Sequence, residues 1–165
     1  MADARLEMEL QKRERVRVAE LIDEIGIAAA FQADERGHHL VVEPVEFGIL
    51  VDADPQILAS VLGNLLQNAF KFTRPNTKVS LSTRATADRV VIEVADECGG
   101  VVGGDGEGLF RAFEQRGLDR TGLGLGLSIS RRGVEANGGE LRVRDLPGTG
   151  CVFSVDLPRL PPSSV

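Results

Sequence analysis

Residues 56–73 of this 165-residue chain read QILASVLGNLLQNAFKFT, and this stretch decides the fold. Its apolar residues recur three and four positions apart, which predicts an amphipathic helix with one buried side. The preceding Asp54-Pro55 pair is typical of a helix start, with Asp54 as the N-cap and proline at the first helical position. We expect this helix to run to about Phe72.

Two asparagines interrupt the apolar pattern of this helix. Asn64 and Asn68 are four residues apart, so they share a face and lie about 6 Å apart along the axis. Neutral carboxamides on an apolar helix need polar partners, which a metal-bound polyphosphate would supply. Lys71 follows on the adjacent edge of the helix, where its ammonium could reach phosphate. The alternatives are helix capping or packing for Asn64, a hydrogen bond to a nearby backbone group for Asn68, and a solvated side chain for Lys71.

Two glycine-rich segments follow this helix in the chain. DECGGV (96–101) comes directly after the predicted strand VVIEVA, and TGLGLGLSI (121–129) opens a second predicted helix. Glycine lets backbone approach a ligand closely, and N–H groups at a helix N-terminus favour phosphate. With the paired asparagines, these segments indicate an ATP site.

The order of these motifs resembles the ATP-binding catalytic domain of bacterial sensor histidine kinases. That group lies within the wider ATPase superfamily of gyrase, Hsp90 and MutL. Five motifs carry the resemblance, and together they are far more specific than any one alone. They are an N box NLLQNAFKFT, a first glycine box DECGG, an F box LFRAFEQ (109–115), a second glycine box GLGLGL (122–127) and a glycine turn GTG (148–150).

The resemblance implies a role for each matched residue. Asn68 would be the Mg²⁺ ligand, and Asn64, Asn68 and Lys71 would form the catalytic group. Asp96 would accept a hydrogen bond from the exocyclic amino group of adenine. The other residues expected at the nucleotide are Gly100, Arg120, Gly122, Gly124, Gly126, Leu127 and Thr149, and Arg116 could join Arg120 at the phosphates. The implied cofactors are ATP and Mg²⁺.

Asn64 discriminates between activities within the superfamily. Gyrase and Hsp90 relatives hold a glutamate at this helix position, where it activates water for hydrolysis. A carboxamide cannot act as a general base. Phosphoryl transfer to a histidine mainly needs positioning and charge neutralisation, because the acceptor brings its own lone pair. Asn64 therefore favours a histidine kinase over a steady ATPase.

The sequence departs from the family pattern at two cysteines. Cys98 occupies the first glycine position of D-x-G-x-G, where a demand for positive φ would weaken nucleotide affinity. Cys151 stands where threonine is usual in the final turn, which removes a hydroxyl from the adenine end of the site.

The remaining pattern predicts one α/β sandwich, a mixed sheet of roughly five strands with about three helices on one face. The resemblance specifies it as a Bergerat-type fold with a mobile ATP lid, which Phe110 and Phe113 would anchor. Two further helices are expected, one over Asp3–Glu24 and one from about Gly122–Gly124 to Asn137, capped by Gly138. Single strands are expected over Ile27–Ala33, His39–Glu43 and Gly48–Val51. Two hairpins are expected, Val79–Arg84 with Arg89–Ala95 and Glu140–Arg144 with Gly150–Leu157, and a loop is expected over Glu97–Arg120.

The expected division is residues 1–24 as an N-terminal helix or remnant of a dimerisation-helix linker, 25–158 as the catalytic domain, and 159–165 as a frayed tail. The net charge of −6 argues against nucleic-acid binding. Two cysteines and no apolar run of about 18 residues suggest a cytoplasmic setting without membrane contact by this domain itself. That setting could be the cytoplasmic portion of a membrane sensor.

His38 and His39, the chain's two histidines, are predicted to lie between strands and not in a helical phosphoacceptor motif. We therefore expect the acceptor histidine on a separate dimerisation domain, in the same full-length protein or a partner, with a response regulator as the next partner. Three alternatives stay open: a non-catalytic nucleotide-binding signalling module, a serine kinase of the anti-sigma-factor type, and a gyrase- or Hsp90-type ATPase.

Overall fold

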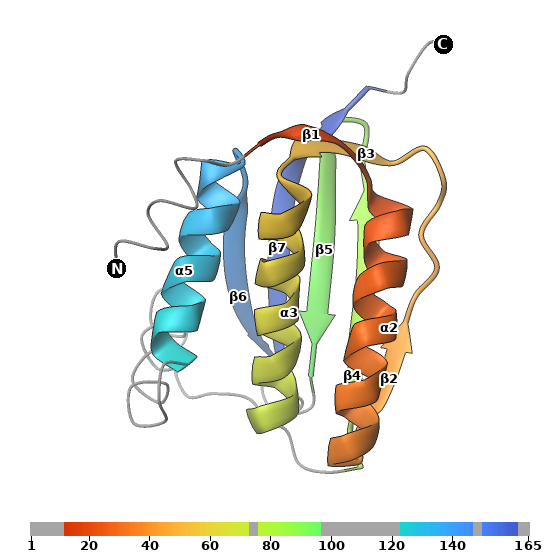
Figure 1. Ribbon diagram of the computed structural model, residues 1–165, viewed down its shortest axis with the longest axis vertical. Helices are drawn as coiled ribbons and strands as arrows, with labels where there is room; N and C mark the ends of the chain where they lie inside the picture. Colours follow the sequence, from red (N-terminus) through yellow and green to blue (C-terminus); the bar gives the residue numbers. More distant parts are fainter. Residues whose placement is uncertain (1–11, 73–75, 97–122, 147–149, 162–165) are drawn as a thin grey trace.

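The computed structural model describes residues 12–72, 76–96, 123–146 and 150–161. Within them, three helices lie on one face of a seven-stranded sheet (Figure 1), which confirms the two-layer α/β sandwich but with more strands than expected. The elements are β1 (Glu14–Arg17), α2 (Val18–Arg36), β2 (His39–Val42), β3 (Leu50–Ala53), α3 (Pro55–Phe72), β4 (Lys78–Ala85), β5 (Arg89–Ala95), α5 (Leu123–Ala136), β6 (Glu140–Leu146) and β7 (Gly150–Leu160).

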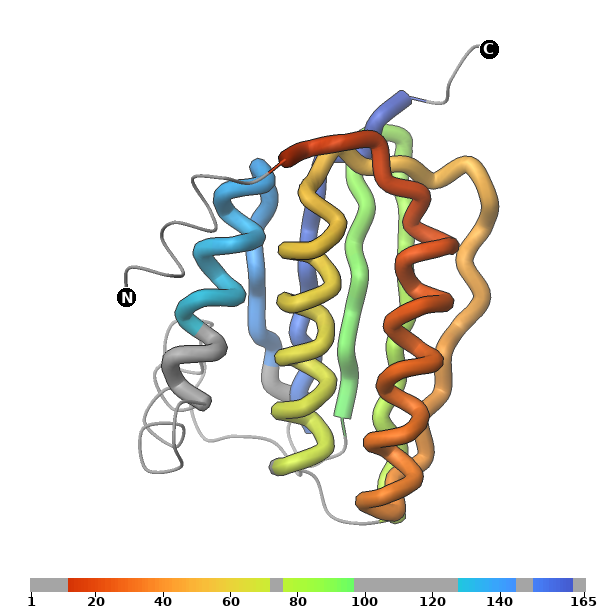
Figure 2. The backbone as a smooth tube through the Cα atoms, in the orientation of Figure 1, coloured from red at the N-terminus to blue at the C-terminus, as the bar shows by residue number. Residues whose placement is uncertain are grey.

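The sheet is mixed, and β7 is its central strand. β7 pairs with β5 along one side, with β6 along the other, and with β3 near its C-terminal end. Among the described strands, β2 and β4 form the parallel pair and the other pairings are antiparallel. Figure 2 shows α3 between α2 and α5, so α3 covers the middle of the sheet.

The N-terminus of α3 is formed as the sequence predicts. The Asp54 carboxylate accepts hydrogen bonds from the backbone N–H of Gln56 at 2.9 Å and of Ile57 at 3.3 Å through the same oxygen, Oδ1. These bonds satisfy two of the N–H groups that a helix start leaves without an intrahelical partner. Pro55 has no N–H to satisfy and occupies the first helical position.

The inner face of α3 forms the centre of the core. Leu58, Leu62, Leu65, Leu66 and Ala69 are each at most 1% exposed. Burying a leucine side chain stabilises a protein by roughly 1.5–3 kcal/mol, so this face fixes the rotation of α3 about its own axis. The polar residues of the same helix are consequently held in fixed directions.

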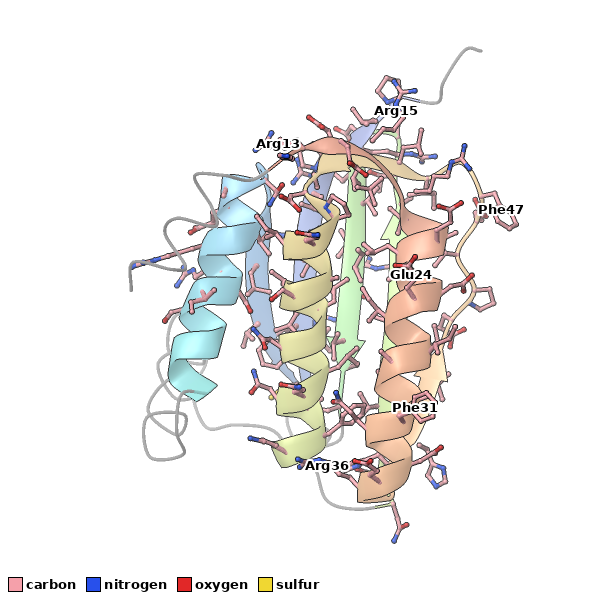
Figure 3. The ribbon with its side chains drawn as sticks, in the orientation of Figure 1. Arg13, Arg15, Glu24, Phe31, Arg36 and Phe47 are labelled. Carbon is pink, nitrogen blue, oxygen red and sulfur yellow. The ribbon has the colours of Figure 1, made fainter. Side chains whose placement is uncertain are left out.

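The prediction of a strand over Ile27–Ala33 is wrong, because this segment continues α2. Ile27 is 66% exposed and Phe31 is 71% exposed, so apolar side chains occur on both faces and hide the helical period. Phe31 lies on the lower half of α2 in Figure 3, and Phe47, which is 93% exposed, lies on the loop between β2 and β3. The helix stops at Gly37, whose φ of 73° is the left-handed conformation that glycine adopts at helix ends.

The N-terminal region also differs from its expected form. Residues 14–17 form β1, antiparallel to β3, where a helix over Asp3–Glu24 was expected; residues 1–11 lie outside the described part. Val16 is 6% exposed, so burial of one side chain and pairing with β3 outweigh local helix propensity. The expected domain boundary at residue 25 falls inside α2.

The C-terminal half matches its predicted elements. Both hairpins are confirmed as β4–β5 and β6–β7, and α5 ends as predicted before Gly138, whose φ is 77°. The expected loop over Glu97–Arg120 lies outside the described residues. None of the helices that the structure describes is long and apolar enough to span a bilayer.

A network of buried polar groups joins three segments at the N-terminus of α3. Besides capping its own helix, Asp54 accepts a hydrogen bond from the Lys12 backbone N–H at 2.8 Å and donates its own N–H to Asn137 Oδ1 at 2.9 Å. Asn137 Nδ2 in turn donates to the Gly133 carbonyl at 2.8 Å. Arg13 also hydrogen-bonds the carbonyl of Ala136 at the end of α5. Asp54 therefore links three segments: its carboxylate caps α3 and binds the residue two positions before β1, and its backbone N–H binds the residue that follows α5.

Charged side chains cover the face of the sheet that carries no helix. Arg89 Nε donates to Asp156 Oδ1 at 2.8 Å, and Arg142 bridges Asp156 at 3.4 Å and Glu140 at 2.8 Å. The hydrogen bond from the Arg142 guanidinium lowers the pKa of the exposed Glu140 carboxyl from its usual value. Because this face of the sheet is polar, it can face solvent, and no third layer is needed to cover it.

We predict that Asp54→Ala lowers the free energy of unfolding by about 1–3 kcal/mol, because it removes the N-cap of α3 and the bond to Lys12. Urea denaturation measures this change. Asp52→Ala, at an exposed position on β3, is the control and should stay within about 0.5 kcal/mol of the unmodified chain. Equal effects of the two substitutions would contradict the linking function of Asp54.

Candidate functional site

The described site residues gather at one end of the molecule. The C-terminal half of α3, the end of β5 and the start of α5 lie at this end, opposite the Asp54 network (Figure 1). α3 contributes Asn64, Asn68 and Lys71, and Asp96 follows β5 directly. The fold thus places segments that are far apart in the sequence around one region.

Asn68 is buried and has an unsatisfied oxygen. It is 2% exposed, and its Oδ1 has no hydrogen-bond partner among the residues that the structure describes. Leaving such an acceptor without a partner costs about 1–3 kcal/mol. A bound cation or hydrogen-bond donor at this oxygen would remove that cost, so Oδ1 is a candidate ligand atom.

Asn64 makes a contact between helices. Its Nδ2 donates to the hydroxyl of Ser130 on α5 at 3.3 Å, and Ser130 is 1% exposed. The packing alternative for Asn64 therefore has direct support. Ser130 was not predicted from the sequence, since a serine inside a helix carries no signal of its partner.

Lys71 is exposed in the last turn of α3, one turn beyond Asn68. A positive charge is favourable at a helix C-terminus, because it interacts with the partial negative charge of the last carbonyls. Its ammonium can still extend from there toward an anion bound near Asn68.

Asp96 is held by the backbone of β7. Its N–H donates to the carbonyl of Cys151 at 3.0 Å, and the N–H of Cys151 donates to Asp96 Oδ1 at 3.2 Å. Asp96 is 5% exposed, so its carboxylate is both buried and oriented. Both bonds use main-chain atoms of Cys151, and they are therefore independent of the side chain at position 151. Sequence reasoning noted Cys151 as a departure but missed this contact.

Part of the second glycine box lies in the described residues. Gly124, Gly126 and Leu127 lie in the first turns of α5, which confirms that the second glycine box opens this helix. The predicted site and lid residues outside the described part of the chain are Cys98, Gly100, Phe110, Phe113, Arg116, Arg120, Gly122 and Thr149.

Within the described residues, the donor set is too sparse for a cation held by protein alone. Among the described residues, no group of three or more His, Cys, Asp or Glu side chains could hold a metal. Mg²⁺ commonly binds through one or two protein oxygens, with waters and substrate phosphates completing its six ligands. A single buried asparagine oxygen fits that mode and does not fit a metal site without substrate.

Comparison with known families identifies the fold. Residues 53–161, more than half of the chain, match the family described as histidine kinase-, DNA gyrase B-, and HSP90-like ATPase. The chain belongs to this family. The match starts at the end of β3 and includes α3, β5, α5 and β7, which are the elements that surround the site.

Curated relatives of this ATPase domain include proteins named as sensor proteins. The chain is 40% identical over 107 residues to the sensor protein KdpD of Mycobacterium tuberculosis, covering 64% of this chain and 12% of KdpD. It is 34% identical over 145 residues to the sensor protein DivL of Caulobacter vibrioides, covering 88% of this chain and 19% of DivL. The chain thus spans less than a fifth of each of these relatives.

Solved structures with a similar fold include a histidine kinase catalytic domain. The nucleotide-free catalytic domain of histidine kinase ThkA matches with a TM-score of 0.78 and 25% identity, over 90% of this chain and 97% of that one. Full-length ShkA in complex with AMPPNP matches with a TM-score of 0.77 and 28% identity, over 93% of this chain and 32% of ShkA. The expected family and fold are confirmed: the chain is a histidine-kinase-type ATPase catalytic domain.

We predict that Ser130→Ala lowers the free energy of unfolding by about 0.5–1.5 kcal/mol, because Asn64 Nδ2 loses its acceptor on α5. Urea denaturation measures the loss. Ser60→Ala makes the same change at an exposed position on α3, and the higher helix propensity of alanine should leave stability equal or slightly raised. A Ser130→Ala variant as stable as Ser60→Ala would show that the Asn64 contact is not maintained in solution.

Proposed function

We propose that this domain binds Mg²⁺-ATP between α3, the end of β5 and the start of α5, and transfers the γ-phosphoryl group to a histidine on a separate dimerisation domain. That histidine would lie in the same full-length protein or in a partner chain. Membership of the ATPase family and similarity to sensor kinases support this proposal. AMPPNP, an ATP analogue, in the similar ShkA structure supports ATP as the nucleotide.

The single observation that carries the proposal is the buried, unsatisfied Oδ1 of Asn68. When bound there, Mg²⁺ would neutralise charge on the phosphate oxygens and orient the γ-phosphoryl group. The protein holds Asn68 in place through the buried leucines of α3, so the ligand oxygen requires little rearrangement on binding.

The remaining residues bind and orient the nucleotide. Lys71 would add a positive charge near the phosphates. The first turn of α5, with Gly124 and Gly126, would direct backbone N–H groups toward them. Asp96 would accept a hydrogen bond from the adenine amino group and so select adenine over guanine.

Asn64 favours phosphoryl transfer over hydrolysis. Its carboxamide has no basic atom to activate water, and its Nδ2 already donates to Ser130. A serine kinase of the anti-sigma-factor type usually keeps a glutamate at this position, so Asn64 also counts against that alternative.

Neither histidine of the chain suits the acceptor. His38 is 6% exposed and hydrogen-bonded to a backbone carbonyl, and His39 lies in β2. The acceptor is therefore placed on another domain, and a response regulator is the proposed recipient of the phosphoryl group. We assign this chemistry to the cytoplasm, where ATP is available. The expectation that residues 1–24 link to a dimerisation helix stays a prediction.

The nucleotide site is tested by calorimetry with ATP and ADP, with and without Mg²⁺. We predict that Asp96→Asn lowers the affinity for both nucleotides about 10- to 100-fold, since a charge-assisted hydrogen bond is lost. Asn68→Ala should weaken Mg²⁺-ATP at least about 10-fold and change Mg²⁺-free binding little. Gln67→Ala, exposed on the same helix, is the control.

Two outcomes of this titration would count against the proposal. Failure of the folded, unmodified chain to bind nucleotide at millimolar concentration would exclude an active kinase, and Cys98→Gly would then test whether Cys98 is the cause. If Asn68→Ala lowers the affinity for ATP equally with and without Mg²⁺, Asn68 is not a ligand of the metal.

The reaction is tested with γ-labelled ATP and dimerisation domains from similar sensor kinases. We predict label on the acceptor histidine, none when that histidine is replaced by glutamine, and background phosphate release without acceptor. Steady phosphate release would indicate an ATPase instead, and acid-stable phosphoserine would indicate a serine kinase. Nucleotide binding without transfer to any acceptor domain would favour a non-catalytic signalling module.

A further inference from the structure

His38 connects the ends of two helices. It follows Gly37 at the C-terminus of α2, and its imidazole is buried against the last turn of α3. Its Nε2 lies 2.9 Å from the backbone oxygen of Phe70; a carbonyl oxygen only accepts, so Nε2 donates. The His38 ring also stacks on the Phe70 ring, with centroids 5.5 Å apart and an interplanar angle of 21°.

This hydrogen bond satisfies a group that α3 cannot satisfy itself. The last four carbonyls of a helix have no intrahelical donor, and Phe70 lies within the last four residues of α3. A histidine near a helix C-terminus can donate to such a carbonyl. Here the donor comes from a residue 32 positions earlier in the chain. His38 is therefore a tertiary cap for α3.

The backbone around His38 is itself held firmly. The His38 N–H donates to the Ala33 carbonyl at 2.9 Å, and the His39 N–H donates to the Thr77 carbonyl at 3.0 Å. The Asn76 N–H also donates to the Gly37 carbonyl at 2.7 Å. With the main chain fixed on both sides, the imidazole gives α3 a rigid point of attachment.

The capped turn carries the candidate ligand groups. Phe70 comes two residues after Asn68 and directly before Lys71. Helix ends fray when their terminal groups are unsatisfied. We propose that His38 is a positioning residue for the Mg²⁺-nucleotide site, because its bond to Phe70 holds the turn that presents Asn68 Oδ1 and Lys71. This inference rests on the proposed function.

The polar character of His38 also needs an explanation. Its second ring nitrogen, Nδ1, is buried and has no hydrogen-bond partner among the described residues. An apolar side chain would fill this position without that cost, which is about 1–3 kcal/mol for an unsatisfied buried polar group. The Nε2 bond to Phe70 offsets this cost and gives a reason for histidine here.

Two substitutions in the full chain separate the donor from the packing. His38→Leu keeps an apolar side chain in the space but removes the hydrogen-bond donor. His38→Gln keeps an N–H donor at a similar reach. His39→Leu and His39→Gln make the same changes at the exposed neighbouring position and serve as matched controls.

The first readout is calorimetry with ATP, with and without Mg²⁺. We expect His38→Leu to lower the affinity for Mg²⁺-ATP about 3- to 10-fold and the affinity for Mg²⁺-free ATP less than about 2-fold. Both affinities of His38→Gln should lie within about 2-fold of those of the unmodified chain. Unchanged Mg²⁺-ATP affinity in folded His38→Leu would overturn the inference. Equal losses with and without Mg²⁺ that His38→Gln does not restore would also overturn it, since they indicate packing alone.

The second readout is amide hydrogen exchange without nucleotide. We expect faster exchange of the Asn68–Phe72 amides in His38→Leu, restoration in His38→Gln, and no change in the His39 variants. Unchanged exchange in His38→Leu would overturn the capping function itself. If the unmodified chain binds no nucleotide, the proposed function fails and the positioning inference fails with it, whereas the exchange data still decide whether His38 caps α3.

Discussion

The structure depends on the immobilisation of α3 at three points. Its N-terminus is capped by Asp54, which also binds Lys12 and Asn137. Its middle is joined to α5 through Asn64 and Ser130, and its last turn is capped by His38. Apolar burial sets how the helix is rotated, and these polar contacts set how it is tilted and where it ends.

This arrangement explains how a site can be prepared before its ligand arrives. The atoms of Asp54, Asn64 and His38 that hold α3 each have a hydrogen-bond partner, whereas Asn68 Oδ1 has none among the described residues. A rigid helix keeps that oxygen in one place, so little ordering remains to be done when a ligand binds. The folded domain carries the free-energy cost of the unsatisfied oxygen, and a ligand bound there, as proposed, would remove it.

The sequence predicted those features that depend on residues close together in the chain. The N-cap Asp54, the turn at Gly138 and the alternation in both hairpins are local signals, and each is confirmed. The segment Ile27–Ala33 was assigned wrongly because its exposed apolar residues hide the helical period. The partners of Asn64 and Phe70 could not be predicted, since Ser130 and His38 meet them only after the helices dock.

The contact between Asp96 and β7 has a consequence for how such a domain can diverge. Because main-chain atoms of residue 151 make both bonds, the orientation of Asp96 tolerates any buried side chain there that preserves the strand. Substitutions can therefore accumulate at position 151 without loss of the backbone hydrogen bonds that orient the Asp96 carboxylate.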